Sequence, residues 1–134
     1  MGRGRRNHLA VSALDPRGLP DGYPFNDEWE ITPRALQALR DGPDAPLIID
    51  VRTTQERAIG CIAGSVHIPL ADLEAQIETL RAHESREICT LCHHGVRSLR
   101  AAAALRRAGF EQVRSVAGGI HLWSVDIDPS IPIY

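Results

Sequence analysis

Residues 47–51, Leu47-Ile-Ile-Asp-Val51, form an apolar run that is interrupted by a single acidic residue. A short run without regular polar alternation is typical of a strand that is buried on both faces. Strands of this kind occur where helices cover both sides of a parallel sheet. The segment therefore predicts a strand inside an α/β domain.

The chain on either side of this strand alternates between strand and helix patterns. Further strands are expected at 29–31, 66–68, 88–91 and 113–116, and helices at 33–40, 53–58, 70–82, 98–108 and 120–125. Connections of only a few residues favour a mostly parallel sheet of about five strands with helices on both faces. Ligands of such sheets bind beyond the carboxyl ends of the strands, which draws attention to the residues after 91.

The length of 134 residues fits one domain with a real core. Residues 1–26 are rich in glycine and proline and are expected to form an irregular arm, with Tyr23 and Phe25 packing its end onto the domain. The remaining residues, 27–134, are expected to form the domain itself.

Composition excludes several classes of function. The formal charge is −2 and all 15 basic residues are arginine. Without lysine there is neither a phosphate-binding loop ending in Gly-Lys-Ser/Thr nor Schiff-base chemistry. The net charge of −2 gives no support for a nucleic-acid partner, and we expect none. We also expect no membrane association, because no apolar run approaches the roughly 18–20 residues of a membrane span. Three cysteines favour a reducing compartment, by default the cytoplasm.

The segment 89–98, CTLCHHGVRS, carries two cysteines and two histidines and could be a metal site. A structural zinc site normally needs four ligands, and only one Cys-x-x-Cys pair is present. His93 and His94 are adjacent, so they cannot both readily turn toward one ion together with Cys92. We therefore expect no metal.

A dithiol pair is the second interpretation of this segment. Cys89 falls inside the expected strand and Cys92 just after it. Three extended residues separate the two α-carbons by about 10 Å, beyond the roughly 7 Å limit for a disulfide. Cys89 is expected to be a small core residue.

The third interpretation is one reactive cysteine in an anion-binding loop. Cys92 would lie at the end of a strand, with Gly95 allowing a tight turn into the next helix. Backbone N–H groups of residues 93–98 and the helix N-terminus would surround the sulfur, and Arg97 would add a fixed cation. Such surroundings favour the thiolate form of Cys92. The alternative is a plain turn with an unreactive cysteine.

Four separated motifs occur in one order: Ile-Ile-Asp-Val-Arg (48–52), Gly-Cys-Ile-Ala-Gly-Ser-Val-His-Ile-Pro (60–69), Cys-His-His-Gly-Val-Arg-Ser (92–98) and Gly-Gly-Ile-His-Leu-Trp (118–123). Over about residues 30–134 the sequence resembles a single-domain rhodanese-like sulfurtransferase. The resemblance implies a three-layer rhodanese-like α/β fold.

The resemblance also implies a persulfide mechanism without a cofactor. Cys92 would take a sulfane sulfur from thiosulfate or from a protein or small-molecule persulfide, and pass it to a thiol, to cyanide or to a sulfur-relay protein. The loop that holds the persulfide would consist of His93, His94, Gly95, Val96, Arg97 and Ser98. Asp50 and Arg52 are expected to brace this site.

The sequence departs from the family in the second motif, where Cys61 replaces a histidine and Ala63 a proline. Cys61 is either a spare buried cysteine or a second thiol that resolves a persulfide. Two other functions stay open: a phosphatase or arsenate reductase, and a non-enzymatic binding module or partner-dependent persulfide carrier. Tyrosine phosphatases place five residues between cysteine and arginine, whereas four separate Cys92 from Arg97. The shorter loop suits a single sulfur better than a phosphate.

Overall fold

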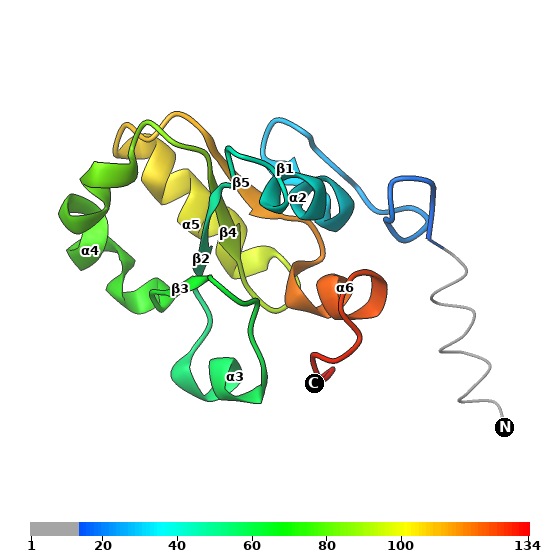
Figure 1. Ribbon diagram of the computed structural model, residues 1–134. Coiled ribbons are helices and arrows are strands. Elements are labelled where there is room, and N and C mark those ends of the chain that lie inside the picture. The colour runs from blue at the N-terminus through cyan, green and yellow to red at the C-terminus, as the bar shows by residue number, and fades with distance from the viewer. Residues whose placement is uncertain (1–13) are drawn as a thin grey trace, which may run out of the picture.

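A five-stranded parallel sheet runs through the centre of the molecule in the computed structural model, which describes residues 14–134 (Figure 1). Its order is β1-β5-β4-β2-β3 and all neighbouring strands are parallel. The strands are β1 (Glu30–Ile31), β2 (Leu47–Asp50), β3 (Val66–His67), β4 (Ile88–Leu91) and β5 (Val113–Val116). The predicted α/β fold with its central parallel sheet is confirmed.

The register of the central strands brings their carboxyl ends to one edge. Asp50 at the end of β2 pairs with Leu91 at the end of β4. Beyond this pair, the N–H group of Val51 donates to the carbonyl oxygen of Leu91 at 2.9 Å. Cys92 therefore leaves the sheet beside the segment that follows Asp50.

Helices cover both faces of the sheet, as Figure 1 shows. On the faces lie α2 (Pro33–Arg40), α4 (Leu73–Leu80), α5 (Val96–Arg107) and α6 (Gly119–Asp126). The short helix α3 (Thr54–Ile59) buries none of its residues and lies beyond the carboxyl end of β2. On one face Ile49 packs with Leu73 of α4 and Leu105 of α5. On the other, Ile48 packs with Leu36 of α2 and Trp123 of α6. Alternate residues of β2 thus face opposite layers, which explains the unbroken apolar run.

Two helix predictions need correction. The helix expected at 70–82 is an α-helix only over Leu73–Leu80, with a 3-10 turn at each end. The helix expected at 98–108 begins at Val96, because Gly95 adopts the left-handed conformation (φ 115°) and turns the chain directly into the helix. Ser98 therefore lies inside the first turn of α5.

The described part of the predicted arm packs on the domain. Leu19 is buried against Ala117 and Leu122, and Tyr23 and Phe25 pack beside them as predicted. The Tyr23 hydroxyl donates to the buried carboxylate of Glu30 at 2.6 Å. Residues 1–13 of that arm lie outside the described residues, and its boundary at residue 26 stays a prediction. No helix within residues 14–134 is long and apolar enough to cross a membrane.

Candidate active site

Cys92 lies at the carboxyl end of the central strand, one residue beyond β4. Its Sγ atom accepts a hydrogen bond from the backbone N–H of Gly95 at 3.0 Å. The hydroxyl of Ser98 lies 3.3 Å from the same sulfur. Only 1% of Cys92 is exposed, so the sulfur lies on the floor of the Cys92 loop, the name used here for residues 92–98.

The N-terminus of α5 forms the wall of this loop. No side chain caps the helix, whose N-cap is Gly95. The amides of its first turn have no carbonyl partner within the helix, as at any helix start, and they carry partial positive charge. The side chain of Val96 is 71% exposed, so this residue can contribute to the loop only through its backbone.

A network of hydroxyl groups holds Ser98 beneath the sulfur. The Ser98 hydroxyl lies 2.7 Å from that of Ser115 on β5, and Thr90 on β4 donates to the Ser98 carbonyl oxygen at 2.7 Å. All three residues are buried. Sequence reasoning found Ser98 but missed Thr90 and Ser115, whose roles depend on which strands are neighbours.

Arg97 points its guanidinium at Glu56 of α3. Both of its terminal nitrogens donate to that carboxylate, one of them at 2.8 Å. These bonds hold the pKa of Glu56 far below its usual range despite its partial burial, and they raise the pKa of Arg97. The charge expected from Arg97 is therefore neutralised by a carboxylate, and the pair fastens the Cys92 loop to α3.

The role of Glu56 was missed, although the sequence carries a signal for its position. Thr53-x-x-Glu56 is a capping box, and the structure forms both of its hydrogen bonds at the start of α3. The capping-box oxygen, Oε1, accepts from the Thr53 N–H and from one Arg97 nitrogen. The other oxygen, Oε2, accepts from the second Arg97 nitrogen.

Asp50 and Arg52 form a fully buried ion pair beside the loop. The guanidinium donates to both carboxylate oxygens, at 3.0 and 2.8 Å. Arg57 donates to the same carboxylate at 3.1 Å. Burial opposes the charge on Arg52, yet its hydrogen bonds with Asp50 and Tyr134 raise its pKa. Arg52 also donates to the Glu56 carbonyl oxygen, so the pair contacts α3 and not Cys92.

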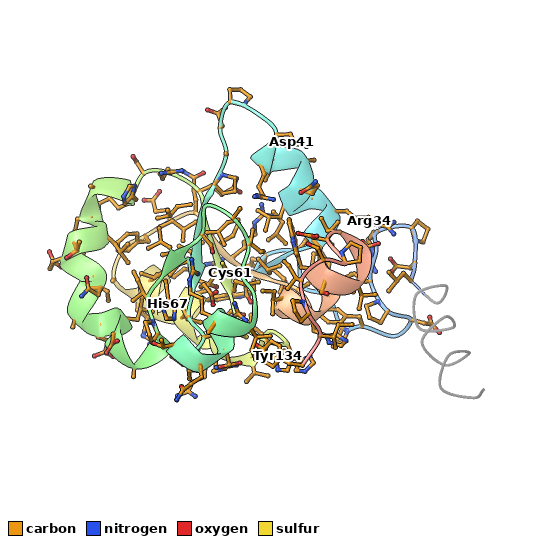
Figure 2. All side chains as sticks on the ribbon, turned by 60° about the horizontal axis from the view of Figure 1, so that its bottom comes forward. Arg34, Asp41, Cys61, His67 and Tyr134 are labelled. Atoms are coloured by element: carbon orange, nitrogen blue, oxygen red, sulfur yellow. The ribbon has the colours of Figure 1, made fainter. Side chains whose placement is uncertain are left out.

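Tyr134 connects this frame to the Cys92 loop. Figure 2 shows it beside α3, where its hydroxyl donates to the Glu56 carboxylate at 2.8 Å and accepts from Arg52 at 3.1 Å. Its ring stacks on the imidazole of His93, with the ring centres 3.8 Å apart and an angle of 8° between the planes. Sequence reasoning expected a tail folded back on the domain but assigned no site role to Tyr134.

The loop is also joined to the N-terminus of α6. The N–H of Ile120 donates to the carbonyl oxygen of Cys92 at 2.8 Å, and that of His121 to the carbonyl oxygen of His93 at 3.1 Å. This approach requires glycine at 119, since a Cβ there would lie 2.3 Å from the His93 carbonyl oxygen. The third and fourth motifs thus meet in space.

His93, His94 and His121, here called the histidine cluster, gather where these two segments meet. One ring nitrogen from each lies within 4.8 Å of the others. Burial, and then the neighbouring His94, lower the pKa of both His93 and His121. Cys92 is not part of this cluster, as expected, but the two adjacent histidines do turn toward a common point.

The other two cysteines have opposite surroundings. Cys89 is fully buried, as predicted, and burial raises the pKa of its thiol to about 12. Cys61 is exposed, so its description as a spare buried cysteine is wrong. It lies in the connection between α3 and β3 and is labelled in Figure 2.

Fold and site together define a parallel α/β domain with a cysteine at the end of its central strand, whose sulfur accepts a backbone N–H bond at a helix N-terminus. The family model described as Rhodanese-like domain matches residues 32–126, and the chain belongs to this family. The resemblance stated from the four motifs is confirmed.

Similar proteins differ in length. The chain is 31% identical over 128 residues to the adenylyltransferase and sulfurtransferase MOCS3-1 of Zea mays, covering 92% of this chain and 27% of that protein. It is 33% identical over 100 residues to YtwF of Bacillus subtilis, named as a candidate sulfurtransferase, covering 75% of this chain and 94% of YtwF. A rhodanese-related protein from Thermoplasma volcanium has a TM-score of 0.65 at 28% identity, covering 79% and 97% of the two chains. The chain spans about a quarter of the length of the plant relatives it matches first.

Proposed function

We propose that this protein is a sulfurtransferase that carries a sulfane sulfur on Cys92. The observation that carries the proposal is the hydrogen bond from the Gly95 N–H to the Cys92 sulfur at the N-terminus of α5. Backbone amides and a helix N-terminus stabilise an anionic sulfur without a metal or an added cofactor. Membership of the rhodanese-like family, with relatives named for sulfur transfer, supports the same activity in its broad sense.

The chemistry takes two displacement steps. The Cys92 thiolate attacks the outer sulfur of thiosulfate; the new S–S bond forms as the old one breaks, and sulfite leaves with the electron pair. An acceptor, cyanide or a thiolate, then attacks the outer sulfur of the Cys92 persulfide, and Sγ leaves as the thiolate. Each step conserves electrons, so no oxidant or reductant is consumed, and the covalent intermediate predicts ping-pong kinetics.

The charge around the loop supports a persulfide over thiosulfate as the natural donor. Thiosulfate is a dianion, whereas Arg97 is paired with Glu56 and the lowered pKa values of His93 and His121 leave those rings largely neutral near pH 7. We therefore propose that thiosulfate reacts weakly and that a protein or small-molecule persulfide reacts better. A thiosulfate KM in the low micromolar range would contradict this preference.

We also propose a sulfur-relay protein as a partner, because the relatives that the chain matches first are much longer proteins. In MOCS3-1 of Zea mays the similar region is about a quarter of a protein that is named for two activities. We propose that this domain receives sulfur from one protein or domain and delivers it to another. A cytoplasmic location, expected from the cysteine count, stays a prediction.

Phosphatase activity is the less favoured alternative. The loop places four residues between Cys92 and Arg97, and the Arg97 guanidinium is bound to Glu56. Hydrolysis of p-nitrophenyl phosphate that depends on Cys92 would support this alternative over sulfur transfer.

Intact-mass measurement tests the proposal directly. Wild-type protein incubated with thiosulfate, and separately with a small persulfide donor, should gain the mass of one sulfur atom and lose it on addition of cyanide. Cys92→Ser should gain nothing, whereas Cys61→Ser, which removes an exposed thiol outside the loop, should behave like the wild type. Sulfur found on Cys61 or Cys89 in the wild type would overturn the assignment of the nucleophile.

A further inference from the structure

The histidine cluster has a geometry that sulfur transfer does not use. Its rings are inclined to one another: His93 and His94 by 34°, His94 and His121 by 45°, and His93 and His121 by 69°. Rings that only stacked would lie nearly parallel, as His93 does on Tyr134. The three rings are inclined, and one nitrogen from each lies within 4.8 Å of the other two.

Two of these residues hold a buried nitrogen without a partner. Among the residues that the structure describes, His93 Nε2 and His121 Nδ1 are the only buried side-chain nitrogen or oxygen atoms that make no hydrogen bond. A buried polar atom without a partner is costly and calls for an explanation. Both such atoms fall within one three-residue cluster, and a bound cation would satisfy them.

Backbone contacts and ring stacking hold His93 and His121 in place before any ion arrives. His121 donates its N–H to the His93 carbonyl oxygen, and the close packing of Gly119 against the same carbonyl group fixes the separation of the two segments. The stacked ring of Tyr134 orients His93. Ligands positioned by backbone contacts and by neighbouring groups lose little freedom on binding.

Three imidazole ligands favour a particular class of ion. Imidazole suits Zn²⁺, Cu²⁺ and Ni²⁺, whereas Mg²⁺ and Ca²⁺ prefer oxygen ligands. Zn–N bonds of about 2.0–2.1 Å at tetrahedral angles place the nitrogens roughly 3.3 Å apart. The nitrogens now lie within 4.8 Å of one another, so a bound ion would draw them closer by up to about 1.5 Å. Three protein ligands leave one coordination position open.

We propose that His93, His94 and His121 bind one divalent transition-metal ion, of which Zn²⁺ fits best, at the rim of the Cys92 loop. The site goes beyond sulfur transfer, because it uses ring nitrogens and not the thiol. The Cys92 sulfur is engaged with Gly95 and lies outside the cluster. The ion would join the Cys92 loop to α6 and present its open position beside the loop.

Calorimetric titration with Zn²⁺ tests the site. The measurement is made on the Cys92→Ser variant, which cannot form the persulfide, so metal binding and sulfur transfer succeed or fail separately. In that background we expect one Zn²⁺ per chain. His121→Ala and His94→Ala should each weaken Zn²⁺ binding by more than about 100-fold. Losing a group that only hydrogen-bonds to a metal ligand already costs about 10–100-fold in affinity, and each of these variants loses a ligand itself. His83→Ala is the matched control, because that histidine lies outside the cluster and its ring is hydrogen-bonded to Arg86; this variant should bind Zn²⁺ like its parent.

Co²⁺ substitution adds a readout of geometry. Three imidazoles and a water should give the visible absorption of tetrahedral Co²⁺ without the thiolate charge-transfer band, in the wild type as in Cys92→Ser. Urea unfolding of each variant shows whether it is folded, and the exposed ring of His94 makes its removal the milder change. The proposal fails if Cys92→Ser binds no ion, if His94→Ala and His121→Ala retain full affinity, or if the Co²⁺ spectrum shows thiolate ligation.

Discussion

Arg97 and Glu56, 41 residues apart in sequence, form a two-point ion pair that ties the first turn of α5 to α3. The arginine thus acts on the Cys92 loop by closing it, not by presenting a free charge to a substrate. The same carboxylate accepts hydrogen bonds from the hydroxyl of Tyr134 and from the backbone N–H of Thr53 at the start of α3. One side chain therefore joins three segments around the site.

Replacing Glu56 by glutamine should destabilise the protein through the loss of these charged hydrogen bonds. We expect the free energy of unfolding to fall by about 1–3 kcal/mol at pH 7. Because the pKa of Glu56 is lowered in the folded state, its contribution is fully present above its ordinary value of 4.5 and is lost as the pH falls below that value. Urea unfolding from pH 7 to pH 3 should therefore show the difference between wild type and Glu56→Gln shrinking below about pH 4.5.

Glu87→Gln is the control for this measurement. Glu87 pairs with Arg114 at a comparable distance of 2.8 Å, and both side chains are more than a quarter exposed. Glu87 directly precedes β4, so the pair lies toward the end of that strand opposite Cys92. Partly exposed pairs contribute about 0–1 kcal/mol. An equal loss of stability in the two variants would contradict the role assigned to Glu56.

Much of the fold could be predicted because its signals are local. The run at 47–51 has no polar alternation because both faces of β2 are covered, and the sequence shows this directly. The start of α5 was placed two residues late, since a glycine permits a left-handed turn without requiring it at that position. The spacing of Leu70, Leu73, Ile77 and Leu80 indicated a helix but could not separate α-helix from 3-10 turns.

The candidate site likewise contains some contacts that a local sequence motif can predict and others that depend on the whole fold. Cys92 and Gly95 are three residues apart, so a sequence motif could hold both. Ser115 reaches Ser98 only because β5 and β4 are neighbours, and His121 reaches His93 only because α6 begins against the loop. Strand order is set by packing over the whole domain, and no local pattern encodes it.

Gly119→Ala should be among the most damaging small substitutions in the chain. The added Cβ would lie 2.3 Å from the His93 carbonyl oxygen, at a position with φ of +62°. The left-handed conformation alone costs about 1–2 kcal/mol, and separating α6 from the loop should bring the total to about 3 kcal/mol or more. Urea unfolding measures the loss, and sulfur transfer should fall with it.

Gly64→Ala separates the two causes. Gly64 has a similar φ of +83°, but an added Cβ meets nothing within 4 Å. This variant should lose only the conformational cost of about 1–2 kcal/mol and keep its activity. A Gly119→Ala variant no less stable than Gly64→Ala would show that the close approach to His93 is unimportant.

Ser98→Ala removes the hydroxyl that lies between the Cys92 sulfur and Ser115. If that hydroxyl stabilises the charged sulfur, its loss should lower kcat for sulfur transfer roughly tenfold, the value of one hydrogen bond of about 1.4 kcal/mol. Ser115→Ala breaks the same hydroxyl pair but leaves Ser98 against the sulfur. It should destabilise the fold similarly and reduce kcat much less; equal losses of kcat would assign Ser98 a structural role only.

Alkylation of the native protein should distinguish the exposed Cys61 from the buried Cys89. Burial raises the pKa of Cys89 to about 12, so at pH 8 only roughly one molecule in ten thousand carries its thiolate. Iodoacetamide should therefore modify the exposed Cys61 first and leave Cys89 intact until the protein unfolds. Peptide mapping against time measures the order, and urea-unfolded protein, in which all three should react, is the control. Cys61→Ser should lose the fastest phase, whereas modification of Cys89 at the rate of Cys61 would mean that β4 is not buried between two helical layers in solution.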